Sequence, residues 1–174
     1  MYSTKIDPKF NKNQNPKIGL IALASDYTIE KDFINVIKDK KIDFFVNRIE
    51  CFNPLTSENL IKMSEKITEV TKDILPDEKI DCVVYGCTSG TIAAGYQSIE
   101  KKIKKAKPEA EVTTPSTASV KALKKMNLNK IAIFTPYPKK LNDEVVDFFK
   151  KENFQITSNS YFDIASDIDI GKVD

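Results

Sequence analysis

A thiol in a glycine-flanked turn is the strongest candidate for chemistry in this sequence. Residues 81–90 read DCVVYGCTSG, an apolar run that ends at a turn around Cys87 and continues into a pattern typical of a helix. At a helix start, backbone N–H groups favour the thiolate and lower the pKa of a cysteine. The same N–H groups, with the hydroxyls of Thr88 and Ser89, can hold a carboxylate. Cys87 is therefore predicted to be a nucleophile or base, the alternative being a small buried residue in a tight turn.

Two further polar side chains are predicted near this turn. Asp26 follows the apolar segment 17–24, and Tyr137 follows the apolar segment 130–134. Each has an ordinary structural explanation, Asp26 as a helix cap and Tyr137 as a packed loop residue between two prolines. Their shared position after predicted strands favours a role in binding, because ligands of parallel sheets bind at the carboxyl ends of the strands.

The absence of histidine narrows the chemistry of any site. With no histidine in 174 residues, Ser-His-Asp triads, Cys-His pairs and His-containing metal sites are excluded. Cys82 lies inside a predicted buried strand and is expected to pack in the core. Cys51 stands in a loop before Pro54 and is the weaker candidate for a role. Three scattered cysteines without a C-x-x-C motif predict free thiols and no metal site.

Composition predicts a cytoplasmic protein that binds neither nucleic acid nor a membrane. The 27 basic and 25 acidic residues give a net charge of +2, which provides no electrostatic argument for nucleic-acid binding. No apolar run approaches the roughly 18 residues that span a membrane. Residues 1–16 lack the apolar core of a signal peptide and are predicted to form a flexible polar arm. The oligomeric state stays open, a homo-oligomer included.

Alternating strand and helix patterns predict an α/β fold, with a parallel sheet in a three-layer α/β/α arrangement. The predicted strands are 17–24, 43–49, 80–85, 111–113, 130–134 and 154–159. The predicted helices are 28–40, 56–75, 90–105, 116–126 and one centred on 141–149. Three turns follow strands of this sheet and are expected to meet at one crevice: 25–27, 86–89 and 135–137.

The two lysine-led strands KIGLI (17–21) and KIAIF (130–134) suggest two similar halves. Residues 17–115 are predicted to form the first α/β half, which carries the Cys87 turn. Residues 116–174 are predicted to form a partial second half. Equal spacing would put the counterpart of Cys87 beyond residue 174, so the second half is predicted to be truncated.

The sequence resembles the aspartate/glutamate racemase superfamily, in the branch of maleate cis–trans isomerases, arylmalonate decarboxylases and ectoine-utilisation proteins. Four segments carry the resemblance in order: IGLIALASDYTIE (18–30), DCVVYGCTSG (81–90), TPSTASVKAL (114–123) and KIAIFTPYPKKLND (130–143). The resemblance implies cofactor-free chemistry beside a carboxylate. It implies that Cys87 is one of two facing cysteines, and that Thr88, Ser89 and Tyr137 bind the substrate carboxylate.

Two departures from the family pattern, together with the cysteine at position 87, shape the expected function. The motif with the second cysteine is missing, which leaves a non-catalytic carboxylate-binding domain as the alternative to a maleate- or aspartate-like isomerase or racemase. Decarboxylases have glycine at the position of Cys87, so decarboxylation is disfavoured. Maleate isomerases usually have asparagine at the position of Asp26. The carboxylate of Asp26 favours a substrate with an amino group, as in the ectoine-utilisation branch.

Overall fold

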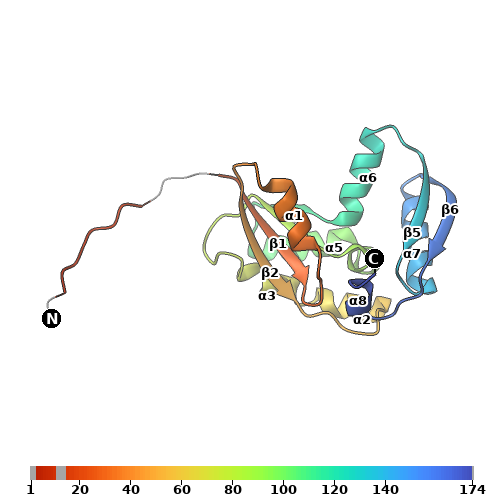
Figure 1. Ribbon diagram of the computed structural model, residues 1–174, viewed down its shortest axis with the longest axis horizontal. Helices are drawn as coiled ribbons and strands as arrows, with labels where there is room; N and C mark the ends of the chain where they lie inside the picture. Colours follow the sequence, from red (N-terminus) through yellow and green to blue (C-terminus); the bar gives the residue numbers. More distant parts are fainter. Residues whose placement is uncertain (1–2, 11–14, 174) are drawn as a thin grey trace.

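A four-stranded parallel sheet forms the centre of the computed structural model, which describes residues 3–10 and 15–173 (Figure 1). Its strand order is β2-β1-β3-β4, with β1 (Lys17–Leu23), β2 (Asp43–Ile49), β3 (Cys82–Tyr85) and β4 (Glu111–Thr113). A second parallel sheet pairs β5 (Lys130–Thr135) with β6 (Gln155–Tyr161). The parallel α/β fold predicted from the sequence is confirmed, with the strands divided between two sheets.

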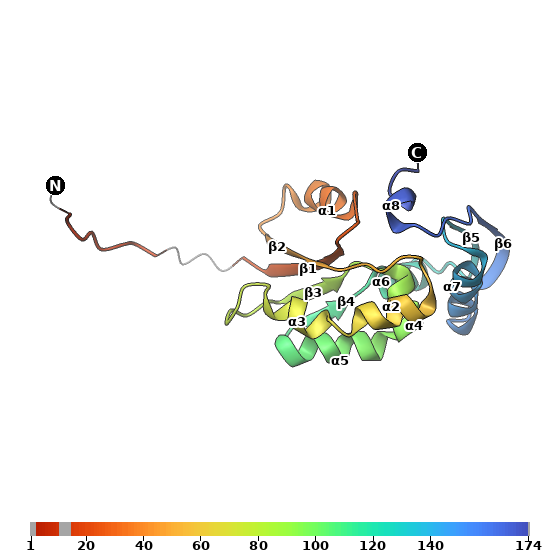
Figure 2. The same ribbon diagram turned by 90° about the horizontal axis from the view of Figure 1, so that it is seen from below.

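Helices cover both faces of the four-stranded sheet (Figure 2). One face carries α1 (Ile29–Ile37); the other carries α2 (Ser57–Ser64), α3 (Ile67–Lys72), α4 (Thr88–Ala94) and α5 (Tyr96–Ala106). The larger core lies between the sheet and this second group of helices, where Ile21, Val83 and Tyr85 are fully buried. The alternating side chains of β1 and β3, among them Leu20 and Val84, pack towards α1 instead.

Two helices predicted as continuous are each divided in the structure. The predicted helix 56–75 is interrupted at Glu65 and Lys66, where the Ser64 hydroxyl donates to the Ile61 carbonyl at 2.6 Å and the N–H groups turn to i−3 acceptors. The predicted helix 90–105 is interrupted at Gly95, whose φ of 79° lies in the left-handed region. The helix behind Cys87 is therefore only the two turns of α4.

The remaining elements connect the two sheets and return to the first. The segment α6 (Pro115–Lys125) leads from β4 to β5, and α7 (Lys139–Lys151) packs on β6 and α4. The β5–α7–β6 unit repeats the order of β1–α1–β2, as the internal similarity predicts. The boundary at residue 115 stays a prediction. Of the predicted polar arm, residues 1–2 and 11–14 lie outside the described residues, and 3–10 form neither helix nor strand.

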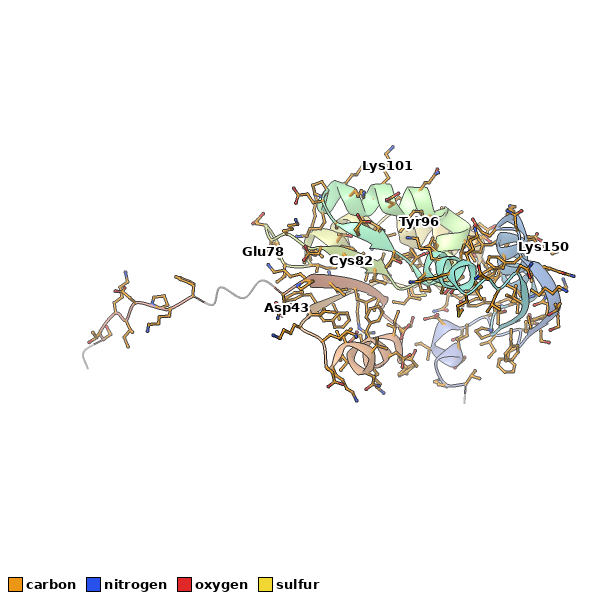
Figure 3. All side chains as sticks on the ribbon, turned by 90° about the horizontal axis from the view of Figure 1, so that it is seen from above. Asp43, Glu78, Cys82, Tyr96, Lys101 and Lys150 are labelled. Carbon is orange, nitrogen blue, oxygen red and sulfur yellow. The ribbon has the colours of Figure 1, made fainter. Side chains whose placement is uncertain are left out.

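The last described helix, α8 (Asp167–Ile170), is held against the first half of the chain. Leu55 N–H donates to the Ala165 carbonyl at 2.9 Å, and Asp167 N–H donates to the Asn53 side chain at 3.1 Å. Figure 2 shows α8 on the α1 side of the sheet, beyond the carboxyl ends of the strands. In Figure 3, Asp43 and Glu78 mark the opposite end of the sheet, beside the N-terminal residues.

Candidate functional site

Cys87 is fixed by backbone hydrogen bonds where β3 ends and α4 begins. The Gly86 N–H donates to the Ile21 carbonyl at 2.9 Å, which ties the turn to β1. Cys87 itself is extended (φ −131°, ψ 112°) and caps α4, because its Sγ accepts the Gly90 N–H at 3.2 Å. Its carbonyl accepts from the Thr91 hydroxyl at 2.7 Å. The sulfur thus has a defined position at the first turn of the helix.

Gly90 leaves room for the sulfur and for a buried phenol. A Cβ at this position would lie 2.8 Å from Cys87 Sγ and 2.7 Å from Tyr85 Oη, closer than real Cβ contacts allow. Met63 Cε would lie 3.3 Å away on a third side. The requirement for glycine here is one of space, since no positive φ is involved.

A cleft of about 240 Å³ opens at this turn and collects the site residues predicted from the sequence. All five line it: Asp26, Cys87, Thr88, Ser89 and Tyr137. They come from three strand ends, those of β1, β3 and β5, which are the three turns expected to meet. Leu23, Ile29 and Ile170 supply apolar walls.

The Cys87 thiol is more strongly protonated than the sequence analysis expects. Burial raises its pKa to about 12, while hydrogen bonds from the Gly90 N–H and the Ser89 hydroxyl lower it by less. Only 4% of the residue is exposed, because it packs in the core cluster that also holds Leu60 and Met63 of α2. The expected net lowering of the pKa is therefore wrong for the unliganded protein: desolvation of the thiolate outweighs the favourable contacts of a short helix.

Tyr137 and Asp26 both line the cleft but differ in their hydrogen-bonding roles. Burial, reinforced by the nearby Cys87, raises the pKa of Tyr137 to about 12, so its hydroxyl is a neutral donor at ordinary pH. Asp26 accepts the N–H groups of Thr28 and Ile29 at 2.7 and 2.8 Å. It therefore caps α1, the ordinary structural role considered for it, and also lines the cleft.

Asp167 is a cleft residue that the sequence analysis missed. It is the first residue of α8, its carboxylate accepts a hydrogen bond from the Ser25 hydroxyl, and it lines the same cleft. Burial raises its pKa, and the neighbouring charge of Asp26 adds to the increase. In the sequence, Ser166 is the residue that could have indicated a helix start here, since its hydroxyl caps α8 by accepting the Asp169 N–H at 3.3 Å. The cleft therefore has two carboxylates on the side away from α4.

The other two thiols differ in their relation to Cys87. Cys51 is partly buried against the core cluster that contains Cys87, and burial followed by the charge of Asp167 raises its pKa to about 11. Cys82 packs on the α1 side of the sheet and is half-buried, so it lies at the edge of the core and not inside it (Figure 3). All three cysteines are free thiols.

Metal and membrane sites are not found in the part of the chain that the structure describes. Residues 3–10 and 15–173 contain no cluster of three or more His, Cys, Asp or Glu side chains arranged to bind an ion. Within the same ranges, every helix is too short or too polar to cross a membrane.

Known proteins resemble the chain in both sequence and structure. The family model of arylmalonate decarboxylase matches residues 93–174. The maleate isomerase of Pseudomonas putida is 26% identical over 171 residues, which cover 91% of this chain and 68% of the relative. The maleate isomerase of Geobacillus stearothermophilus is 22% identical over 172 residues, with the same coverage. The chain is thus similar to maleate isomerases and to the arylmalonate decarboxylase family model. The resemblance stated from the sequence is thereby confirmed.

Solved structures of these relatives share the fold. A maleate isomerase from Pseudomonas putida S16 with maleate superposes with a TM-score of 0.81 at 19% identity, covering 92% of this chain and 69% of that one. A mutant Nocardia farcinica maleate cis–trans isomerase with a covalently bound succinylcysteine intermediate gives 0.82 at 19% identity, with the same coverage. The family-model match begins after Cys87, so the role of this cysteine rests on the geometry of its turn.

Proposed function

We propose that the protein is a cofactor-independent isomerase or racemase that acts on a small carboxylic acid, with Cys87 as nucleophile or base. The observation that carries the proposal is that Cys87 lines a cleft together with three hydroxyl-bearing residues, Thr88, Ser89 and Tyr137. Relatives that include maleate isomerases support the same class of chemistry. Hydroxyl and backbone donors hold one carboxylate, which places the adjacent carbon near the sulfur.

For an unsaturated acid, the proposed step is addition of the sulfur to the alkene. The Cys87 thiolate forms a C–S bond to one alkene carbon, and the alkene electron pair moves towards the carboxylate on the other carbon. The former double bond then rotates as a single bond. The electron pair returns, the alkene re-forms and the C–S bond breaks, which restores the thiolate. The succinylcysteine in the Nocardia farcinica relative corresponds to the adduct after protonation of the carbon.

For an amino acid, the proposed step is removal of the α-proton. Cys87 takes the proton as a thiolate, the electron pair is delocalised into the carboxylate, and a proton delivered to the opposite face inverts the centre. This reaction needs a second proton donor. The family's second cysteine motif is absent from these 174 residues, and Cys51 is a thiol that packs against the core cluster containing Cys87.

The charges of the cleft favour a substrate that carries an amino group. Asp26 and Asp167 both line the cleft, and an additional carboxylate between them would be repelled. An ammonium group would be attracted by the same pair. We therefore place the substrate carboxylate at Thr88 and Ser89 and an amino or other cationic group towards the two aspartates.

A non-catalytic carboxylate-binding domain is the second candidate. It is favoured by the burial of Cys87, which keeps the thiol protonated, and by the missing second cysteine motif. Such a domain would bind small acids in the same cleft and leave them unchanged.

Proton NMR in D₂O distinguishes the two candidates. Maleate, L-aspartate and D-aspartate are incubated separately with the protein, and isomer formation and loss of the α-proton signal are followed. Cys87→Ser is expected to abolish turnover, while Cys82→Ser, on the other face of the sheet, serves as the matched control. Equal turnover by Cys87→Ser and the unmodified protein would refute the role of Cys87. Binding without turnover, measured by calorimetry, would support the second candidate.

A further inference from the structure

Close to Cys87, on a residue that does not line the cleft, lies a buried hydroxyl that is unpaired among the described residues. Tyr85 ends β3 and is fully buried in the core beneath α4. Its Oη has no hydrogen-bond partner among the described residues. Leaving a buried hydroxyl unpaired lowers stability, and phenylalanine would fill the same space without that cost.

The unpaired hydroxyl faces the same small space as the sulfur. The point at which a Gly90 Cβ would stand is 2.7 Å from Tyr85 Oη and 2.8 Å from Cys87 Sγ, so the phenol and the thiol flank one glycine. On its other sides, the sulfur has the Gly90 N–H at 3.2 Å and the Ser89 hydroxyl at 3.9 Å. A donor at Tyr85 would add a third contact from the buried side.

We propose that Tyr85 is a positioning residue whose hydroxyl donates a hydrogen bond to the Cys87 sulfur when the thiol loses its proton. The step moves one proton from Sγ to solvent or substrate, and the phenol keeps its own. Burial, and then the adjacent Cys87, raise the pKa of Tyr85 far above its ordinary value, so the phenol remains a donor. Hydrogen bonds to a charged acceptor are about twice as strong as those between neutral groups.

This inference rests on the proposed use of Cys87 as a thiolate, but its test does not require turnover. Tyr85→Phe and the unmodified protein are alkylated with iodoacetamide from pH 7 to pH 10, and labelling of each cysteine is followed by peptide mass spectrometry. Because only the thiolate reacts, the rate below the pKa reports the thiolate fraction. Tyr85→Phe is expected to slow Cys87 labelling about tenfold at each pH, which corresponds to a pKa higher by about one unit.

Stability measurements separate this role from a structural one. Urea unfolding of Tyr85→Phe is expected at the same or a higher concentration, because the variant removes an unpaired buried hydroxyl. Tyr96→Phe is the matched control: its hydroxyl donates to the Val112 carbonyl at 3.0 Å, so its loss should lower stability and leave Cys87 labelling unchanged (Figure 3). An unchanged or faster Cys87 rate in Tyr85→Phe would overturn the inference, and so would a slower rate accompanied by a loss of stability. Slower labelling in a protein that turns over no acid would uphold this inference while the proposed function fails.

Discussion

Replacement of Gly90 by alanine should reverse the usual effect of this substitution in a helix. Gly→Ala inside a helix ordinarily stabilises by about 1 kcal/mol. Here the new Cβ would stand 2.7 Å from Tyr85 Oη and 2.8 Å from Cys87 Sγ, and neither atom lies at the end of a flexible exposed chain. Overpacking of a well-filled core costs about 1–3 kcal/mol. The net expectation is a loss of about 1 kcal/mol, measured by urea unfolding.

The same variant should disturb the sulfur, and Gly95→Ala supplies the comparison. Gly95 has a φ of 79° and no atom within 4 Å of an added Cβ, so alanine there is strained without touching Cys87. We expect about 1 kcal/mol of destabilisation in both variants. Only Gly90→Ala should change the rate of Cys87 alkylation. A Gly90→Ala protein more stable than the original, with an unchanged Cys87 rate, would refute the close packing of Tyr85, Gly90 and Cys87.

Four further predictions concern charge. Because burial raises the pKa of Cys87 to about 12, its alkylation in the unliganded protein should be slow at pH 8 and accelerate about tenfold per pH unit; a plateau near pH 8 would contradict this. The raised pKa also means that the protonated thiol stabilises the folded protein at pH values below the ordinary pKa of cysteine, and that this stability is lost as the pH rises towards 12. Thermal unfolding of Cys87→Ser and of the original protein at several pH values measures this loss. Lys107→Met should destabilise the protein by about 2 kcal/mol, because the ammonium group of the buried Lys107 donates to the carbonyls of Leu75 and Glu78 at 2.8 Å each. Lys105 is exposed, so Lys105→Met should change little in the same urea assay. Equal effects of the two substitutions would contradict a stabilising role of the Lys107 hydrogen bonds. Asp167→Asn should tighten maleate binding in calorimetry by removing one cleft carboxylate, whereas Asp169→Asn, exposed on the same helix, should not.

The strand pattern and the Cys87 turn were predictable because both depend on local sequence. Buried parallel strands read as continuous apolar runs, and β1 (Lys17–Leu23), buried from Gly19 onward, lies within the predicted strand 17–24. The meeting of Asp26, Cys87 and Tyr137 followed from the rule that carboxyl ends of parallel strands share one edge. Interruptions of helices were not predicted, since a single Gly95 or a Ser64 hydroxyl leaves the apolar periodicity unchanged.

What the sequence did not reveal depends on tertiary packing. Asp167 lies in a segment without periodicity, and it reaches the cleft because residues 53 and 55 bind the backbone near α8. The direction of the Cys87 pKa shift was wrong because burial in a core cluster sets it, and residues distant in the sequence, such as Leu60 and Met63, build that cluster. The apolar strand pattern likewise predicts that Tyr85 is in the core but does not predict that its hydroxyl lacks a hydrogen-bond partner.

A comparison of the reaction rates of two alkylating reagents tests most directly the proposal that Cys87 lies beside a carboxylate-binding site. Iodoacetate carries a carboxylate beside the reactive carbon, and iodoacetamide is its neutral analogue. Cys87 is expected to react faster with iodoacetate than with iodoacetamide, with saturation and with protection by the acid that binds best in calorimetry. The partly buried Cys51 and Cys82 should show the opposite preference. A Cys87 that prefers iodoacetamide, without saturation or protection, would contradict a thiol poised beside a bound carboxylate.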